Sequence, residues 1–250
     1  MAASGGRATR LVLVRHGEAQ CHVDQVVGGT RGCTGLSELG RRQAEALRRR
    51  LERTGELAAA DALYASTLPR AVETAEAIAA VLGAPTVKQD EDLCELRPGE
   101  ADGITWEDFR ARYAYPGTGG DLYRPMAPGA ESWAVFCARV GAALARLAAA
   151  HEGETVVAAC HGGVIECSLR ALGEVPLSPR FLVRIENASI TEWERPPAGD
   201  GERRWTLVRF NDAAHLADLP APEQGVPGGG PVRPGGARPP GRRGPATGGR

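Results

Sequence analysis

The segment Arg10-Leu11-Val12-Leu13-Val14-Arg15-His16-Gly17-Glu18 decides how the rest of the chain is interpreted. Its apolar run over residues 10–14 is typical of a buried strand, and polar residues follow at once. Residues 155–160 have the same design, with β-branched and small apolar residues that end on His161-Gly162-Gly163. The sequence therefore predicts two buried strands, each of which ends on a histidine next to glycine.

A third run of this kind covers residues 61–65 and leads through Ser66-Thr67 to Arg70. In open α/β sheets the carboxyl ends of the strands line the ligand crevice, so the polar residues after the three strands can meet there. Each strand is followed by a loop or by the start of a helix, where free backbone N–H groups favour an anion. These features together predict an anion site at one edge of a sheet.

Helices and further strands fill the remaining sequence. Helical spacing and capping residues predict helices over residues 37–53, 69–82, 131–150 and from Gly163 to about Leu172. Further strands are expected over residues 181–186, 189–193 and 205–210. Strands that alternate with helices predict an α/β fold, specifically a three-layer αβα sandwich with a mostly parallel central sheet.

The composition divides the chain into three parts. Residues 1–9 are small and polar and are expected to form a flexible arm, and residues 10–218 are expected to form a single catalytic domain. Residues 219–250 consist mainly of Gly, Pro, Ala and Arg, a composition that cannot bury enough apolar surface to fold. We therefore expect residues 219–250 to be a disordered tail.

The charge balance and the cysteines limit the classes of partner. The chain has 30 Lys and Arg against 31 Asp and Glu, so no overall field draws it to nucleic acid or to a membrane. Its six cysteines form no CxxC pair, which indicates free thiols in a reducing compartment. The sequence shows neither an apolar span of about 20 residues nor the apolar run of a signal peptide. We expect a cytoplasmic protein that is a monomer or a homodimer.

The residue types after the three strands suit a phosphorylated ligand. The guanidiniums of Arg15 and Arg70 offer planar forks to phosphate oxygens. One histidine can attack phosphorus while a second donates to the same oxygens, and the glycines next to His16 and His161 let the backbone approach closely. The sequence contains no HExxH, paired-cysteine or Walker motif, so we expect no metal and no cofactor.

These segments resemble the histidine phosphatase superfamily, also called phosphoglycerate-mutase-like. The resemblance spans about residues 10 to 210, with its motifs in the expected order. After residues 11–18, the segments that carry it are Gly35-Leu36-Ser37-Glu38-Leu39-Gly40, Ala65-Ser66-Thr67-Leu68-Pro69-Arg70-Ala71, Leu93-Cys94-Glu95, Cys160-His161-Gly162-Gly163 and Asn187-Ala188-Ser189-Ile190-Thr191.

The resemblance implies a metal-independent phosphomonoester hydrolase that acts on a small phosphorylated metabolite. His16 would be the nucleophile that forms a phosphohistidine, and Glu95 would be the general acid and base. Glu18 and Glu166 are the other candidates for the acid. The residues that would bind the substrate are Arg15, His22, Arg70, His161 and Gly162.

Two positions depart from the family pattern. His22 stands where relatives commonly have Asn, and Ala101 stands where many have Trp. Both changes are expected to touch the wall of the pocket. We expect the dianion of bound phosphate to outweigh the effect of Arg15 and Arg70 on His22 and to favour its protonated form.

Two other functions stay open. A phosphoglycerate mutase uses the same catalytic residues, but its Arg-His-Tyr run after the acid is here Leu96-Arg97-Pro98, which favours a phosphatase. A phosphate- or phosphoprotein-binding module with little catalysis is the other alternative. The contacts to the leaving group would come from the segment after residue 105, where the candidates are Arg110, Arg112, Tyr113, Tyr123 and Arg124.

Overall fold

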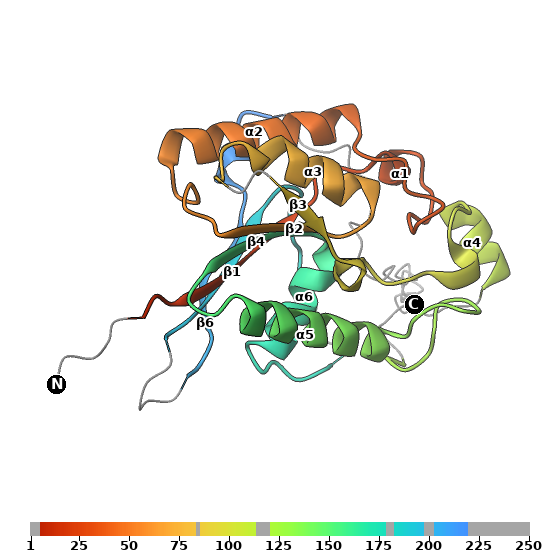
Figure 1. Ribbon diagram of the computed structural model, residues 1–250. Coiled ribbons are helices and arrows are strands. Elements are labelled where there is room, and N and C mark those ends of the chain that lie inside the picture. Colours follow the sequence, from red (N-terminus) through yellow and green to blue (C-terminus); the bar gives the residue numbers. More distant parts are fainter. Residues whose placement is uncertain (1–5, 84–85, 114–120, 179–182, 198–202, 220–250) are drawn as a thin grey trace, which may run out of the picture.

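The computed structural model describes residues 6–83, 86–113, 121–178, 183–197 and 203–219, and its centre is a six-stranded sheet (Figure 1). The strands are β1 (Thr9–Arg15), β2 (Ala62–Ala65), β3 (Val87–Gln89), β4 (Thr155–Cys160), β5 (Ile190–Arg195) and β6 (Thr206–Asp212). Their order across the sheet is β3-β2-β4-β1-β5-β6. The pairs β3–β2, β2–β4 and β4–β1 are parallel, whereas β5 is antiparallel to both β1 and β6.

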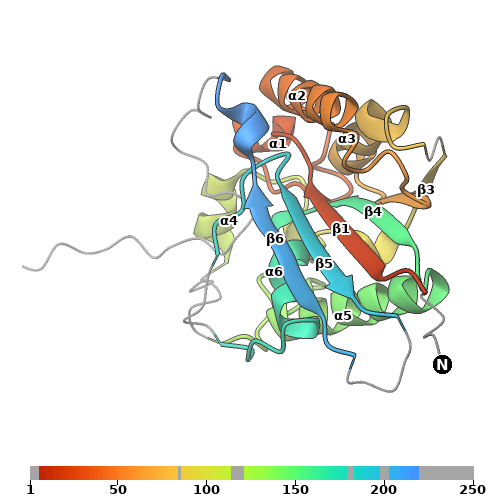
Figure 2. The same ribbon diagram turned by 90° about the vertical axis from the view of Figure 1, so that its left-hand side faces the viewer.

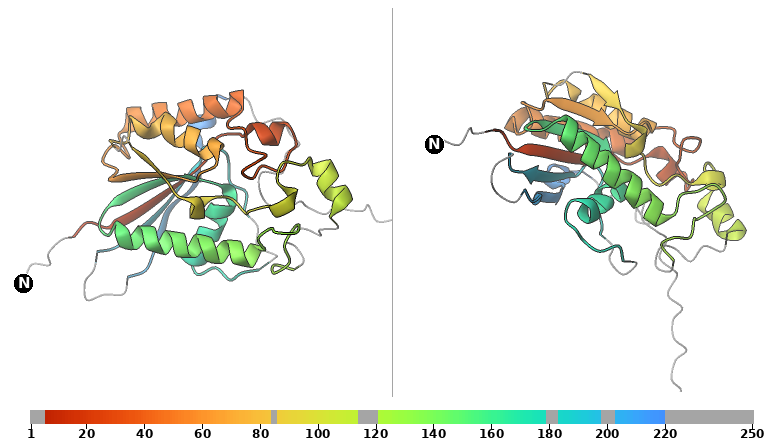
Figure 3. Two further views of the ribbon diagram at one scale, coloured as in Figure 1. Left: turned by 45° about the vertical axis from the view of Figure 1, so that its right-hand side comes forward. Right: turned by 60° about the horizontal axis from the view of Figure 1, so that its bottom comes forward.

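Two pairs of helices cover the two faces of the sheet (Figure 3). On one face lie α2 (Glu38–Thr54) and α3 (Pro69–Ala79), and on the other lie α5 (Trp133–Ala150) and α6 (Gly162–Ala171). Strand alternation explains the division, because successive side chains of a strand point to opposite faces. The predicted three-layer αβα sandwich is confirmed.

The alternation is clearest in β1, where odd and even residues enter different cores. Leu11 and Leu13 pack with α5 and α6, and Val12 and Val14 pack with α2 and α3. All four side chains are buried, which is why this segment is apolar without interruption.

Local signals set the helix boundaries. The side chain of Ser37 caps α2 by accepting a hydrogen bond from the Gly40 N–H at 3.0 Å, and α2 ends at Gly55, whose φ is +65°. Pro69 stands in the first turn of α3. Ser132 caps α5 in the same way as Ser37 caps α2, so α5 begins two residues later than expected.

The sequence did not predict α1 (Gln20–Val23), β3, α4 (Trp106–Arg112) or the three short 3₁₀ helices of the described residues. The strand expected over residues 181–186 is wrong for residues 183–186, which are irregular, and residues 181–182 lie outside the described ranges. Side chains occupy the backbone groups that a strand would use. Asn211 bonds the Arg184 carbonyl and the Glu186 N–H.

At the N-terminus, the domain begins slightly earlier than the sequence predicts. Thr9, expected in a flexible arm, belongs to β1 and accepts a hydrogen bond from the Gly153 N–H at 2.9 Å. At the other end, β6 forms the edge of the sheet beside β5 (Figure 2) and is followed by the short helix η3 (Ala214–Leu216). Nearly all of the expected disordered tail, residues 220–250, lies outside the described ranges, so its disorder stays a prediction.

By length and composition α5 could also cross a membrane. Its buried residues, among them Phe136, Val140 and Leu144, pack against the sheet together with α6. The apolar composition of α5 is therefore that of a core helix.

Candidate active site

The five predicted catalytic residues come from the carboxyl ends of four neighbouring parallel strands. Arg15 is the last residue of β1, and His16 follows it. Arg70 lies in the first turn of α3 after β2, and His161 is the residue between β4 and α6. Glu95 follows β3 through the short helix η1 (Glu91–Leu93). Because β3, β2, β4 and β1 are adjacent, the sheet itself brings these segments together.

The ring of His16 is fixed in one tautomer. Its Nδ1 lies 2.5 Å from the carbonyl oxygen of Gly17. A carbonyl can only accept, so Nδ1 carries the proton and Nε2 keeps its lone pair. The glycine allows this turn, because a Cβ on Gly17 would stand 2.4 Å from the Gly40 carbonyl at the start of α2. The backbone therefore fixes the position of His16 Nε2, a ring nitrogen without a proton.

Two buried arginines flank His16. The Nε of Arg70 donates to His16 Nε2 at 3.1 Å, and its Nη1 donates to the Gly28 carbonyl at 2.8 Å. Arg15 donates through Nη1 to the Ile185 carbonyl. Within the described part of the chain its Nε has no hydrogen-bond partner. Arg15 thus keeps a buried donor that an anion can use.

His161 offers a second such donor. Its Nε2 lies 2.6 Å from Ser66 Oγ, which also accepts a hydrogen bond from the Leu68 N–H at 3.2 Å. When the Ser66 hydroxyl donates to Nε2, the neutral ring carries its proton on Nδ1. His161 Nδ1 is buried and has no partner among the described residues. A Ser66 hydroxyl that donates to Nε2 therefore leaves His161 with an N–H donor at Nδ1.

Burial and neighbouring positive charge lower the pKa values of His16, His161 and Arg15. Desolvation lowers the pKa of His16 and of His161 well below the usual value, and Arg70 and Arg15 lower both further. Desolvation also brings the pKa of Arg15 down to about 10, although Glu95 and Glu186 oppose this. Both imidazoles are consequently neutral at neutral pH, and a neutral ring on His16 is what a nucleophile requires.

Glu95 is held against the start of α6. Its Oε2 accepts a hydrogen bond from the Gly163 N–H at 3.0 Å, and its Oε1 accepts one from the Leu96 N–H at 3.1 Å. Desolvation raises the pKa of this carboxyl, against the lowering effect of those two hydrogen bonds and of Arg70 and Arg15. A carboxyl with a raised pKa is suited to donating a proton.

The two other candidates for the acid are engaged elsewhere. Glu18 Oε1 accepts a hydrogen bond from Ser37 Oγ at 2.6 Å at the start of α2. Glu166 pairs with Arg170 at 2.7 Å within α6, and both side chains are almost fully buried. Among the three carboxylates, the geometry therefore favours Glu95.

His22 and Gly162 also lie at this site. The ring centroids of His16 and His22 are 5.8 Å apart, and those of His16 and His161 are 5.0 Å apart. A Cβ on Gly162 would stand 3.6 Å from Arg15 Nε. Desolvation, Arg70 and Arg15 lower the pKa of His22 to about 3. In the free protein His22 is therefore a neutral hydrogen-bonding group, not a cation.

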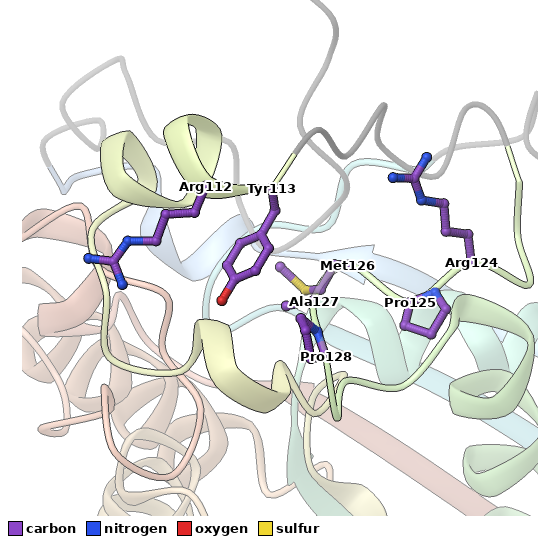
Figure 4. A pocket seen from close by; sticks show the side chains of 7 residues that line it. All are labelled: Arg112, Tyr113, Arg124, Pro125, Met126, Ala127 and Pro128. Carbon is purple, nitrogen blue, oxygen red and sulfur yellow. The ribbon is translucent and has the colours of Figure 1, made fainter.

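A pocket of about 440 Å³ lies beside α4 (Figure 4). Of the residues expected to contact a leaving group, Arg112, Tyr113 and Arg124 line it, whereas Arg110 and Tyr123 do not. This region is tied to the segment that follows His22. Val26 pairs with Thr105, and the carboxylate of Asp102 accepts hydrogen bonds from the N–H groups of residues 29, 31 and 32.

Ala101 is fully buried in the small core of this region. It packs with Val27, Phe109 and Ala127, and because Ala127 lines the pocket, Ala101 lies behind the pocket wall. A larger side chain at position 101 would have to displace these three residues.

The structure adds residues to which sequence reasoning gave no role. Asn187 Nδ2 and the Ala188 N–H both donate to the His16 carbonyl, at 3.0 and 3.2 Å. Ala188 has a φ of +52°, a conformation that few residues other than glycine adopt. The motif at residues 187–191 pointed to this segment but not to its contact with His16. Within the described ranges, no group of three His, Cys, Asp or Glu residues is placed to hold a metal ion.

Comparison with known proteins agrees with this arrangement. The model of the histidine phosphatase superfamily (branch 1) matches residues 11–213. Phosphoglycerate mutase-like protein 4 of Arabidopsis thaliana is 32% identical over 83% of this chain and 87% of its own length. The metal-independent phosphoserine phosphatase of the same plant is 29% identical over 88% of each chain.

Solved structures show the same likeness. The mycobacterial glucosyl-3-phosphoglycerate phosphatase, in a complex with VO3, superposes with a TM-score of 0.66 at 30% identity and covers 81% of this chain and 98% of its own. The family model and the Arabidopsis relative both span most of the chain. The chain therefore belongs to the histidine phosphatase superfamily.

Proposed function

We propose that the protein hydrolyses phosphomonoesters through a phosphohistidine on Nε2 of His16. The observation that carries the proposal is the fixed tautomer of His16, whose Nδ1–H bonds the Gly17 carbonyl and leaves Nε2 without a proton, so that its lone pair, which accepts a hydrogen bond from Arg70 in the free protein, can attack phosphorus. The phosphatases among the relatives and solved structures support hydrolysis as the reaction.

The reaction has two steps. His16 Nε2 attacks phosphorus, the bond to the leaving oxygen breaks, and Glu95 gives its proton to that oxygen. Water then attacks the phosphohistidine, Glu95 takes a proton from the water, and His16 and inorganic phosphate are released. The buried donors of Arg15 and His161, together with Arg70, stabilise the charge on the phosphoryl oxygens in both steps.

His16→Ala tests the nucleophile. The parent protein, mixed with labelled substrate and denatured in alkali, should retain label that acid then releases, and His16→Ala should retain none and turn over no p-nitrophenyl phosphate. A variant that folds and keeps most of its activity would show that His16 is not the nucleophile. Absence of turnover by the parent on a panel of phosphorylated metabolites would instead favour the phosphate-binding module.

Glu95→Gln tests the acid, with Glu18→Gln as its matched control. Loss of a general acid costs on the order of 10² to 10⁴ in rate, and the loss is greatest for an alkyl phosphate, whose leaving oxygen needs the proton. We expect Glu95→Gln to lose activity on this scale and Glu18→Gln to stay close to the parent. The reverse order would assign the acid to Glu18.

EDTA should leave the parent unaffected, and inhibition by EDTA that added metal reverses would contradict a metal-independent reaction.

Mutase activity is tested directly with 3-phosphoglycerate, with and without 2,3-bisphosphoglycerate. Arg97, the one cation in the run Leu96-Arg97-Pro98 that follows Glu95, is half-exposed and lies 4.0 Å from Asp92. We expect release of phosphate to exceed formation of 2-phosphoglycerate. Faster interconversion than hydrolysis would make the protein a phosphoryl transferase.

We further infer that the leaving group enters the pocket beside α4 and carries a negative charge. Arg112 and Arg124 line this pocket together with Tyr113 (Figure 4). Phosphoserine and glucosyl-3-phosphoglycerate, which the names of two similar phosphatases contain, both carry a carboxylate. Arg112→Met should raise KM for such a substrate more than for p-nitrophenyl phosphate. Arg110→Met, on the same helix but outside the pocket lining, is the control, and equal effects of both variants would reject the inference.

A further inference from the structure

Arg139, in the middle of α5, makes an unusual number of contacts with the segment that presents Glu95. Its Nη1 donates to the carbonyls of Asp92 and Cys94 at 2.7 and 3.1 Å, and its Nη2 donates to the carbonyl of Glu95 at 3.3 Å. Its guanidinium also lies over the ring of Phe136, with 5.1 Å between Cζ and the ring centroid. One side chain thus bonds three carbonyl groups within four residues of sequence.

A buried ion pair extends this contact to the other side of Glu95. The Nε and Nη2 of Arg139 both bond the carboxylate of Glu131 at 2.7 Å, and both side chains are about nine-tenths buried. Glu131 also accepts a hydrogen bond from the Arg97 N–H at 3.0 Å, and its own N–H donates to the Arg97 carbonyl at 2.9 Å. The Arg139–Glu131 pair therefore fixes the backbone both before and after Glu95.

The segment around Glu95 needs such support because it belongs to no regular helix or strand that would bond its carbonyl groups. After η1 the chain is irregular from Cys94 to Pro98, so no strand or helix ladder holds these carbonyls. Burial of a carbonyl without a partner is costly, and the planar guanidinium supplies several donors in one fixed geometry. α6 holds the carboxyl of Glu95 through the Gly163 N–H, whereas α5 holds its backbone through Arg139.

We propose that Arg139 is a positioning residue for Glu95, and that with Glu131 it fixes the distance between this carboxyl and the leaving oxygen of the substrate. The proposal rests on the proposed role of Glu95 as the general acid. Arg139 itself touches neither the substrate nor the reacting atoms. Its contribution to kcat/KM lies in the step in which the leaving oxygen receives its proton, whereas the later attack of water, in which Glu95 acts as the base, affects kcat.

The dependence of the rate on the leaving group separates this role from a general structural one. An alkyl phosphate needs a proton on the departing oxygen, whereas p-nitrophenolate departs without one. Arg139→Met should lower kcat/KM for an alkyl phosphate by roughly 10- to 100-fold and for p-nitrophenyl phosphate by less than about threefold. A purely structural defect would lower both by the same factor.

Arg146→Met is the matched control. Arg146 lies two turns further along α5 and bonds the carboxylates of Asp90 and Asp92 at 3.0 and 3.1 Å. It contacts the same acidic turn but none of the carbonyls that Arg139 bonds. Arg146→Met should stay within about twofold of the parent on both substrates, in line with the small effect of exposed ion pairs.

A double variant shows whether Arg139 acts through Glu95. In the Glu95→Gln background, Arg139→Met should leave the ratio of alkyl to aryl activity unchanged, because the proton donor is already absent. If Arg139→Met does not fold, Glu131→Gln removes half of the pair and should shift the same ratio in the same direction. Equal losses on both substrates, or an unchanged ratio in Arg139→Met and Glu131→Gln, would overturn the proposal. A normal ratio in Glu95→Gln itself would instead disprove the role of Glu95 in the proposed function.

Discussion

Gly163→Ala would place a methyl group against the carboxyl of Glu95 and displace it. Gly163 is in the first turn of α6 with ordinary helical backbone, so alanine is not strained there and would favour the helix by about 0.8–1 kcal/mol. Its Cβ, however, would stand 2.2 Å from Glu95 Oε1 and 2.8 Å from Phe136 Cε1. Phe136 is fully buried in the core, so the carboxyl of Glu95 is the group that has to move.

The size of the effect follows from these distances. Ordinary contact with a Cβ begins near 3.4 Å, so the Glu95 oxygen must retreat by roughly 1.2 Å, and a misplacement of about 1 Å costs on the order of 10² in rate. We expect a loss of about 100-fold in kcat/KM for an alkyl phosphate and a much smaller loss for p-nitrophenyl phosphate.

Measurement of kcat/KM on both substrates, with the melting temperature as a check on folding, decides the matter. The control is Gly141→Ala, another helical glycine at the contact of α5 and α6, whose Cβ would meet only the Ala171 Cβ at 3.4 Å. Gly141→Ala should behave like the parent. If folded Gly163→Ala keeps half or more of its activity on the alkyl phosphate, Glu95 is not the proton donor or is not held by Gly163.

Four other predictions follow from the geometry. Ser66→Ala removes the hydroxyl that sets the tautomer of His161, so inhibition by vanadate should weaken while folding is retained, and unchanged inhibition would contradict this role. The pKa of His22 is about 3, so His22→Asn and the parent should show the same pH dependence of phosphate inhibition between about pH 5 and 8, and diverging profiles would show that bound phosphate protonates His22. Because the pKa of Glu95 is raised, its proton is retained at low pH and lost as pH rises, so kcat/KM for an alkyl phosphate should fall on the alkaline side, and Glu95→Gln should lack this fall. Leu47 is fully buried between α2 and the sheet, so Leu47→Ala should cost about 2–5 kcal/mol of unfolding free energy by urea titration.

The sequence was sufficient to predict the parts of the site that come directly after strands. The run at residues 10–14 and the pattern at 155–160 identify β1 and β4, and the polar residues after them lie together because these strands are adjacent in the sheet. Caps and turns also gave several helix boundaries, such as Ser37 for α2 and Pro69 for α3. These are local properties, which a sequence displays directly.

Contacts between distant residues were not predictable in this way. The pKa of His22 in the free protein is lowered first by desolvation and then by the charges of Arg70 and Arg15, and the sequence does not display how deeply the ring is buried. Residues 183–186 have the composition of a strand, but Asn211 and Arg15 bind their backbone groups. Arg139 stands among the core residues of an apolar helix, and its spacing gives no sign that it bonds carbonyls 44 to 47 positions away.

The two ends of the site are supported to different degrees, and this difference bears on specificity. On the phosphate side, His16 and His161 extend directly from strands whose residues are almost fully buried, so a change there disturbs the main core. On the side of the proposed leaving-group pocket, α4 packs on the small core that contains Ala101 and Phe109 and joins the domain through short contacts such as Val26–Thr105. Side chains that line the pocket beside α4 can therefore change without displacing the phosphate-binding residues. Under the proposed function, substitutions in this pocket would change the leaving group while the chemistry at His16 stays the same.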